Sequence, residues 1–230
     1  MQLTRNTKIA LGAFLAFDLL VASWLVYLFL VRSEIDEINA LRDLGATRYP
    51  EPTALQDIRL TDSAGNLFTE EDFKGKWSLV FFGFISCPDV CPLTMAELDR
   101  FYSNPGDIDS SELPNIVFVT VDPGRDGPEE VGAFVRQYHD DFIGLTGTEA
   151  QIARAAEQFY VAYQVSNGDH SGHGESHNAM PAEMNPDDYR VDHNTHVSLV
   201  NPQGELAAVI RPPIRGEVMR RLYPQLVTTD

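Results

Sequence analysis

This 230-residue chain has only two cysteines. Two thiols cannot supply the several disulfides of a small stapled domain, nor a four-cysteine zinc site. Basic residues are also few: 17 Lys and Arg stand against 34 Asp and Glu, which gives a net charge of -17. Such a chain has no basic surface with which to displace counterions from phosphates, so a nucleic-acid partner is excluded. With 43% hydrophobic and 22% charged residues, the composition is that of a globular protein.

An apolar run long enough to cross a membrane occurs once, at residues 9–31 (IALGAFLAFDLLVASWLVYLFLV). A spanning helix needs about 20 apolar residues, and this run contains one charge, Asp18. Arg5 and Lys8 precede it, so we predict a cytoplasmic tail over residues 1–8, a transmembrane anchor over 9–31 and the remainder on the outer side. Without an Arg- and Ser-rich transit peptide, the predicted location is a bacterial plasma (inner) membrane, with the C-terminal domain on the periplasmic or extracytoplasmic side. The alternative is a cleaved signal peptide.

Beyond the anchor, strand and helix patterns alternate. Residues 32–52 are expected to form an amphipathic helix and then a linker with two prolines, so the folded domain begins near Thr53 and occupies 53–230. The predicted strands are 58–61, 67–69, 77–85, 115–121, 142–145, 192–200 and 205–210, and the predicted helices are 92–102, 127–138, 148–163 and 215–222. This alternation predicts an α/β fold in which helices cover both faces of a central mixed sheet.

The two cysteines lie four residues apart in residues 86–92 (SCPDVCP), between a predicted strand and a predicted helix. Pro92 fits the first helical position, which places Cys91 near the helix N-terminus, where the dipole favours a thiolate. At this spacing Cys87 and Cys91 can form a reversible disulfide or present two sulfurs to one soft metal. A purely structural disulfide is the competing interpretation, but so short a loop constrains the unfolded chain little.

Two thiolates suit Cu(I), which accepts two or three soft ligands, and they are too few for a closed zinc site. A histidine would complete a three-ligand copper site. The six candidates are His139, His170, His173, His177, His193 and His196. Spacing alone does not choose among them, although His193 and His196 open a predicted strand, which holds a ligand more rigidly than a loop does.

Four segments resemble the Sco/SenC family in sequence and in order: residues 83–92 (GFISCPDVCP), 120–126 (TVDPGRD), 144–148 (GLTGT) and 188–193 (DYRVDH). The resemblance covers the chain from about Thr53 to Arg215. It implies a thioredoxin-like domain tethered by one N-terminal helix. It also implies that Cys87, Cys91 and His193 are the copper ligands, matched by position to the family's motifs.

The function implied by this resemblance is delivery of copper to the binuclear copper site of cytochrome c oxidase subunit II, with reduction of that site's cysteines as an additional activity. A periplasmic copper donor or a thiol reductant would be a further partner. Asp122 and Asp126, in the second segment, are expected to cap their loop; the alternative is that they shape the site or a partner surface.

Residues 166–188 depart from the family, which commonly has a short segment here. The segment has no apolar period and is predicted to be a long surface loop. It contains five residues with imidazole or thioether groups, both of which are copper ligands. These residues are His170, His173, His177, Met180 and Met184. We hypothesise a second, weaker copper-capture site; the alternative is a solvated loop whose histidines have no role.

The main alternative function is a thiol–disulfide oxidoreductase of exported proteins. In that case Cys87 and Cys91 are a catalytic redox pair and His193 is dispensable. A peroxidase of the same fold has no independent support in the sequence. A redox or copper sensor that binds a membrane partner through residues 33–45 is a further alternative.

Overall fold

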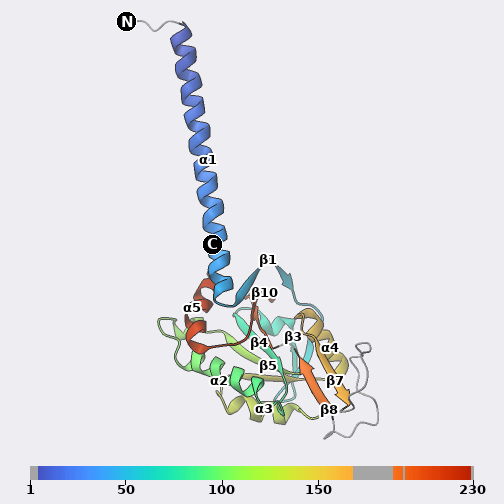
Figure 1. Cartoon of the computed structure of the whole chain (residues 1–230). Coiled ribbons are helices and arrows are strands. Elements are labelled where there is room, and N and C mark those ends of the chain that lie inside the picture. Colours follow the sequence, from blue (N-terminus) through green and yellow to red (C-terminus); the bar gives the residue numbers. More distant parts are fainter. Residues whose placement is uncertain (1–4, 168–188, 194, 229–230) are drawn as a thin grey trace. The chain divides into compact units, whose positions relative to one another are not determined.

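The computed structural model describes residues 5–167, 189–193 and 195–228 and divides into two units, Met1–Asp43 and Leu44–Asp230 (Figure 1). Unit 1 consists of one helix, α1 (Arg5–Asp43). Its large apolar side chains are exposed in an unbroken series from Trp24 to Leu30, so all sides of the helix are apolar there. Within the part of the chain that the structure describes, no helix combines the length and the hydropathy of a membrane span.

Unit 2 begins earlier than the sequence pattern predicts. The predicted linker is part of a strand, β1 (Ala46–Ala54), which pairs antiparallel with β10 (Glu205–Ile210). The pairing is interrupted by an irregularity, and Pro50 and Pro52 lie within it. Proline has no backbone N–H to donate to a neighbouring strand, so it is tolerated on an edge strand. The prediction of a linker was therefore wrong, because the prolines occupy a sheet edge.

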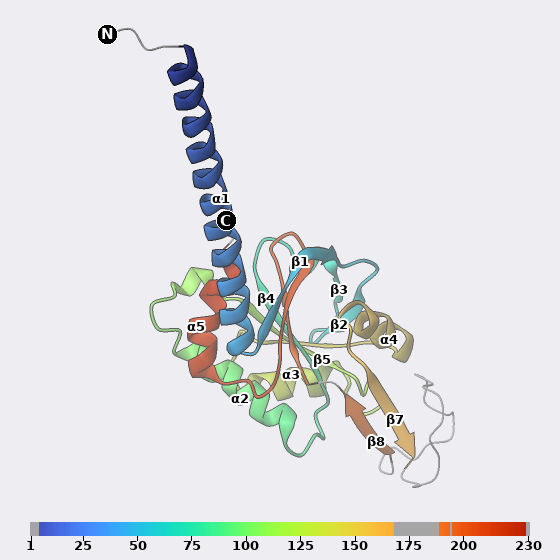
Figure 2. The ribbon, with the colours of Figure 1, turned by 45° about the horizontal axis from the view of Figure 1, so that its top comes forward.

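An eight-stranded mixed sheet forms the centre of unit 2, with the strand order β1-β10-β9-β4-β5-β6-β2-β3 (Figure 2). Strands β4, β5 and β6 are parallel, and the other neighbours are antiparallel. The bounds not yet given are β2 Arg59–Asp62, β3 Leu67–Thr69, β4 Ser78–Gly83, β5 Asn115–Thr120, β6 Ile143–Thr146 and β9 Val197–Val200. All six residues of β4 are buried, as expected for an apolar run at the centre of a sheet.

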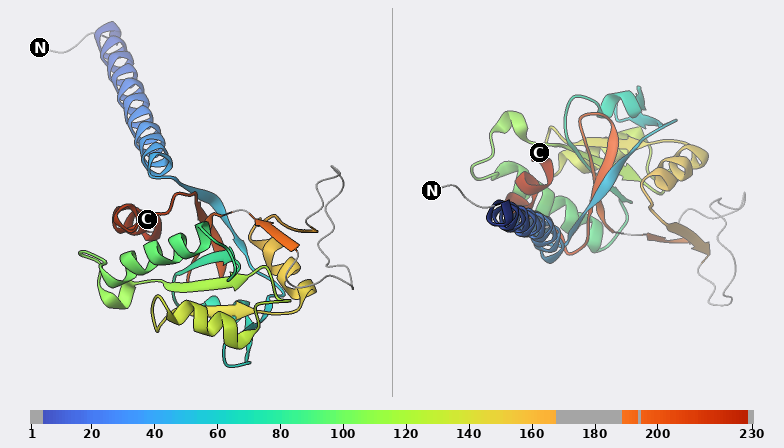
Figure 3. Two further views of the ribbon diagram at one scale, coloured as in Figure 1. Left: turned by 60° about the horizontal axis from the view of Figure 1, so that its bottom comes forward. Right: turned by 90° about the horizontal axis from the view of Figure 1, so that it is seen from above.

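Helices cover both faces of this sheet, as predicted. They are α2 (Val90–Ser103), α3 (Pro128–Arg136), α4 (Glu149–Gln158) and α5 (Gly216–Val227), with short 3-10 helices at Glu70–Phe73 and Ser110–Glu112. Seen from above, α2 and α5 lie on one side of strands β1 and β10, and α4 lies on the other (Figure 3).

Aromatic contacts show the same alternation of faces. Phe81 of β4 is the register partner of Phe118, and Phe118 packs against Phe134 of α3. The next residue, Phe82, instead packs against Phe159 at the end of α4. Successive side chains of a strand point to opposite faces, so the pairing of the two phenylalanines with different helices follows directly.

The topology places the cysteine segment at one edge of the sheet. Helix α2 connects β4 to β5 and α3 connects β5 to β6, and all three strands are parallel. The carboxyl ends of these strands and the N-termini of α2 and α3 therefore lie at the same edge. Helix α2 is held there by α5, where the Gly216 N–H donates to Glu97 Oε2 at 2.8 Å.

A separate two-stranded antiparallel sheet consists of β7 (Tyr163–Asn167) and β8 (Tyr189–His193). The predicted strand over 192–200 is therefore wrong as one element: its first residues belong to β8 and its last to β9, in a different sheet. The predicted helix over 148–163 ends at Gln158, because Tyr160 has a left-handed φ of 54°. Ser166 and Asn167 of the predicted loop belong to β7, and residues 168–188 lie outside the described residues.

Candidate metal and thiol site

The two cysteines meet where β4 turns into α2. Their sulfurs are not joined in a disulfide. The backbone N–H of Cys91, in the first turn of α2, donates to Cys87 Sγ at 3.4 Å, and the N–H of Cys87 donates to the Phe84 carbonyl at 3.2 Å. The turn therefore holds the Cys87 sulfur over the start of the helix that carries Cys91, as the motif predicts.

The two sulfurs differ in exposure. Cys91 has no exposed surface, whereas Cys87 is partly exposed. Burial raises the pKa of the Cys91 thiol, a backbone hydrogen bond with Phe84 opposes the rise, and Cys87 and Asp126 add to it. Desolvation by burial therefore opposes the thiolate that the helix dipole favours at Cys91. Cys87 is the sulfur that an approaching molecule reaches first.

Gly83 makes room for the buried sulfur. A Cβ added at this last residue of β4 would lie 2.9 Å from Cys91 Sγ and 2.9 Å from the ring of Phe118. Real Cβ atoms essentially never approach so closely. The absence of a side chain at Gly83 thus allows Cys91 to pack directly on the end of the sheet. Gly83 opens the segment 83–92 that resembles the family, but the sequence gives no reason for a glycine there.

Asp126 ties the cysteine segment to the loop after β5. Its buried Oδ2 accepts hydrogen bonds from the Ile85 N–H at 3.0 Å and from Thr120 Oγ1 at 2.6 Å. Burial raises the pKa of this carboxyl, and the hydrogen bonds from Thr120 and Ile85 oppose the rise. The bond from Thr120 fits the expected loop-capping role, and the bond from Ile85 fits the alternative, in which Asp126 shapes the cysteine segment.

Asp122 also has the expected role within that loop. Its buried carboxylate accepts a hydrogen bond from Nε of Arg125 and forms an ion pair with it, while its backbone carbonyl accepts from the N–H of Asp126 at 3.0 Å. The loop is joined to β4 by the Val121 N–H, which donates to the Gly83 carbonyl at 2.7 Å. These bonds make residues 121–126 a rigid support for the cysteines.

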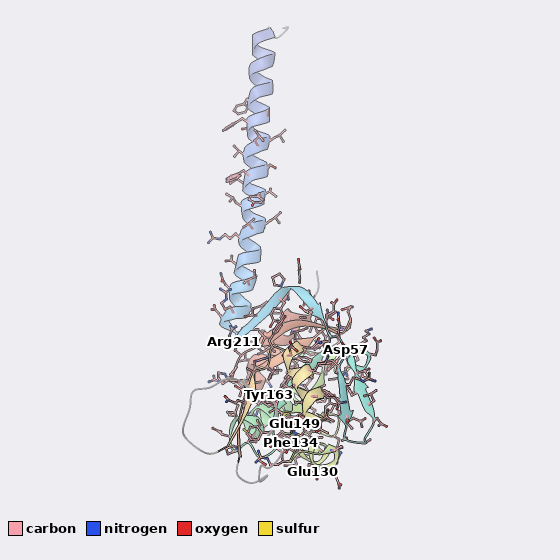
Figure 4. The ribbon with its side chains drawn as sticks, turned by 90° about the vertical axis from the view of Figure 1, so that its right-hand side faces the viewer. Asp57, Glu130, Phe134, Glu149, Tyr163 and Arg211 are labelled. Carbon is pink, nitrogen blue, oxygen red and sulfur yellow. The ribbon has the colours of Figure 1, made fainter. Side chains whose placement is uncertain are left out.

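His193 is the last residue of β8, and its backbone is paired with Tyr163 in β7. The side chain of His193 lies outside the described residues, so its assignment as the third ligand stays a prediction. Its neighbour Tyr163 lies close to Glu149 of α4 (Figure 4). Burial and, to a smaller extent, Glu149 raise the pKa of the Tyr163 hydroxyl.

Two other histidines have different partners. His196 is partly buried, and its Nε2 lies 3.3 Å from the Phe159 carbonyl. Burial lowers the pKa of His196 and this hydrogen bond opposes the change. The ring of His139 packs instead on Tyr102 and Phe142. Both rings are thus used in packing or backbone contacts.

The five candidate residues of the second copper site lie outside the described residues: His170, His173, His177, Met180 and Met184. Across the described ranges, no three or more His, Cys, Asp or Glu side chains are grouped so as to hold a metal ion. The described part of the site is therefore a pair of sulfurs, one partly exposed and one buried. Soft sulfur donors fit Cu(I) among the common biological metals.

Comparisons with known proteins identify relatives. The sequence model of the SCO1/SenC family matches residues 47–223. The chain is 31% identical over 194 residues to a putative copper-binding protein of Stutzerimonas stutzeri, covering 84% of this chain and 86% of that protein. It is 32% identical over 170 residues to the mitochondrial protein SCO2 of Saccharomyces cerevisiae, covering 74% of this chain and 50% of that protein. The chain thus spans about half the length of the yeast relative.

Solved structures give the same grouping. Apo Sco1 of Thermus thermophilus has a TM-score of 0.62 at 31% identity, with 78% of this chain and 94% of that chain covered. ScoI of Arabidopsis thaliana, solved with copper bound, has a TM-score of 0.61 at 25% identity, with 77% and 96% covered. The mixed sheet with helices on both faces is therefore the thioredoxin-like architecture of these proteins.

Proposed function

This chain belongs to the SCO1/SenC family, and from that premise we propose that it is a copper chaperone of cytochrome c oxidase assembly. It binds copper through Cys87, Cys91 and His193 and delivers it to the binuclear copper site of cytochrome c oxidase subunit II. The observation that supports the proposal best is the contact between the cysteines, in which Cys91 N–H lies 3.4 Å from Cys87 Sγ at the end of β4. Two sulfurs on one turn are a ligand pair for a soft monovalent ion.

Binding requires both cysteines in the reduced form, because a disulfide has no thiolate to offer. Loading displaces the thiol protons, including that of Cys91, whose pKa is raised by burial. Copper affinity is therefore expected to fall as the pH falls. Delivery proceeds by ligand exchange, in which sulfur and imidazole groups of the acceptor replace those of the chaperone one at a time.

His193 is proposed as the third ligand on the strength of its sequence position, directly after Val191 and Asp192. The described backbone adds one supporting fact: His193 ends β8, which is paired along its whole length with β7. A ligand at the end of a paired strand is better supported than one within a long loop.

We further propose that residues 9–31 anchor the chain in a bacterial plasma membrane, with unit 2 on the extracytoplasmic side. The support is the apolar sequence, the two basic residues before it, and the exposure of large apolar side chains around α1. An anchor confines donor and acceptor to one surface and so raises their effective concentration. Recovery of the full chain in the aqueous fraction after cell lysis would contradict the anchor.

The difference in exposure of the two thiols favours one alternative, a thiol–disulfide oxidoreductase of exported proteins. In that reaction the exposed Cys87 attacks a disulfide, and the buried Cys91 then resolves the mixed disulfide. This activity needs both cysteines and does not need His193.

Metal analysis of the reduced full chain in detergent tests the proposal. One tightly bound copper per chain is expected, and it should be lost in Cys87→Ser, Cys91→Ser and His193→Ala. If His193→Ala loses copper but still reduces insulin, then copper binding requires His193 and the reductase activity does not. Failure of the wild-type chain to bind copper would reject the chaperone function.

A further inference from the structure

Helix α2 presents an apolar surface to solvent beside the exposed cysteine. Among the described residues of unit 2, four large apolar side chains are exposed: Leu67, Val90, Leu93 and Tyr160. Two of them, Val90 at 37% and Leu93 at 56% exposure, lie in the first turn of α2. Residues three apart share one side of a helix. Half of these exposed side chains therefore lie together beside the cysteine pair.

The opposite side of the same turn already faces the core. Cys91, Thr94, Met95 and Leu98 are buried. Val90 and Leu93 are not part of this buried set, so their exposed surface is available to a partner. Together with the exposed Pro88, which directly follows Cys87, they form a group of exposed apolar side chains that we name the apolar rim (Pro88, Val90 and Leu93). A group of exposed apolar side chains at a reactive centre is typical of a docking surface.

Exposed carboxylates lie at this edge of the sheet. Asp89 is exposed between Pro88 and Val90, and the exposed Glu129 and Glu130 are in the first turn of α3, at the same edge of the sheet. Arg125, the nearby cation of the supporting loop, is paired with Asp122. A partner therefore binds this surface best when it has apolar side chains to cover the rim and positive charges to face these carboxylates.

We propose that the apolar rim docks a partner polypeptide segment in which a cysteine is flanked by apolar and basic side chains. The contact brings the sulfur of that cysteine to Cys87, the more exposed member of the pair. This inference rests on the proposed function, because ligand exchange requires the acceptor sulfur to reach the site, and it adds the sequence chemistry of the acceptor. Peptide selectivity measured without copper tests the rim independently of metal delivery.

The test is the rate at which the reduced full chain in detergent reacts with two synthetic peptides. Each contains one cysteine activated as a 2-pyridyl disulfide; leucine and lysine flank it in one peptide, serine and aspartate in the other. In the reaction, the Cys87 sulfur bonds to the peptide sulfur and the peptide–pyridyl S–S bond breaks. Pyridine-2-thione leaves with the bonding electrons, and the Cys87 proton goes to the buffer. Release of the thione is followed by its absorbance.

The wild-type chain is expected to react several-fold faster with the leucine/lysine peptide. The ratio of the two rates cancels any change in the intrinsic reactivity of Cys87. The double variant Val90→Ser/Leu93→Ser should reduce the ratio toward one at unchanged helix content. Leu67→Ser, at a side chain that is also 56% exposed but lies in the edge strand β3, is the matched control and should keep the wild-type ratio.

A ratio near one in the wild-type chain, or a wild-type ratio in the double variant, would overturn the proposal. So would sedimentation showing that the rim holds two copies of the chain together, with dissociation in the double variant. Metal analysis of the same preparation reports separately on the proposed function. A chain that selects the leucine/lysine peptide but binds no copper supports the docking surface and rejects the chaperone.

Discussion

The buried carboxylate of Asp126 accepts a hydrogen bond from the backbone N–H of Ile85 at 3.0 Å, although 41 residues separate the two in sequence. The same oxygen accepts the Thr120 hydroxyl at 2.6 Å. Ile85 lies two residues before Cys87, so this contact determines where the chain turns as it leaves β4. The cysteine pair is therefore positioned from the neighbouring strand β5 as well as by its own helix.

Replacing Asp126 with alanine should destabilise unit 2. The substitution leaves the Ile85 N–H and the Thr120 hydroxyl without an acceptor in a buried site, at a cost of about 1–3 kcal/mol for each group. Urea unfolding of the full chain in detergent measures the loss. Asp109→Ala, which removes an exposed carboxylate that bonds only within its own turn, is the control and should cost far less. Equal stability of the two variants would show that Asp126 does not support the segment.

Asp126→Asn removes the titratable carboxyl but keeps an oxygen that can accept both hydrogen bonds. The pH dependence of stability should therefore change in this variant. Burial raises the pKa of Asp126 above its ordinary value near 3.8. A carboxyl with a raised folded-state pKa stabilises the fold fully below the unfolded pKa, and that contribution is lost as the pH rises through the folded pKa. The stability of Asp126→Asn relative to wild type should therefore rise from acid pH toward neutral pH. A stability difference between Asp126→Asn and wild type that stays constant from about pH 3 to about pH 7 would contradict the raised pKa of Asp126.

The sequence allowed prediction of elements whose signals are local. The apolar run that forms β4, the proline and acidic residues that begin α3, and the Thr148 N-cap, which accepts a hydrogen bond from the Gln151 N–H, all depend on residues close together in the chain. The spacing of Cys87 and Cys91 likewise predicted their contact, because four residues fit one turn.

Other features depend on contacts between distant residues and have no local signal. Ile85 donates to the Asp126 carboxylate through its backbone N–H, so the identity of residue 85 carries no information about Asp126. Pro50 and Pro52 indicate a linker in isolation, yet β10 supplies a sheet edge where they are tolerated. Cys91 packs against the end of β4 because Gly83 has no side chain. The short distance between Gly83 and the Cys91 sulfur is apparent only in the packed structure.

Copper binding should depend on three ligands and should not depend on His196. Even groups that only orient a metal ligand contribute about 10–100-fold to affinity, so loss of a ligand in Cys87→Ser, Cys91→Ser or His193→Ala should weaken binding by more than about a hundredfold. Competition with a Cu(I) chelator measures the affinity. His196→Ala is the matched control, because its Nε2 bonds to the Phe159 carbonyl, and this variant should keep wild-type affinity. Loss of copper in His196→Ala with retention in His193→Ala would reverse the assignment.

Gly83→Ala should disturb the site by overpacking. The added Cβ would lie 2.9 Å from Cys91 Sγ and from the Phe118 ring, both in a closely packed region, and such strain typically costs about 1–3 kcal/mol. The midpoint of urea unfolding and the copper affinity should both decrease. In the control Gly127→Ala, the added Cβ meets the flexible end of the Glu130 side chain, and the loss should be below about 1 kcal/mol. Wild-type stability in Gly83→Ala would show that Cys91 has room to move.

The segment that the sequence predicts to be a loop, residues 166–188, should add copper capacity without contributing to the tight site. Imidazole groups on a long polar segment give a weak site, since ordering the segment opposes binding. We expect the full chain to bind more than one copper per chain at high copper concentration. The triple variant His170→Ala/His173→Ala/His177→Ala should lose the excess and keep the copper bound at Cys87 and Cys91. Equilibrium dialysis at two copper concentrations measures the ratio, with His139→Ala as the single-histidine control outside the loop. An unchanged ratio in the triple variant would reject the second site, because no other group of imidazoles was assigned to it.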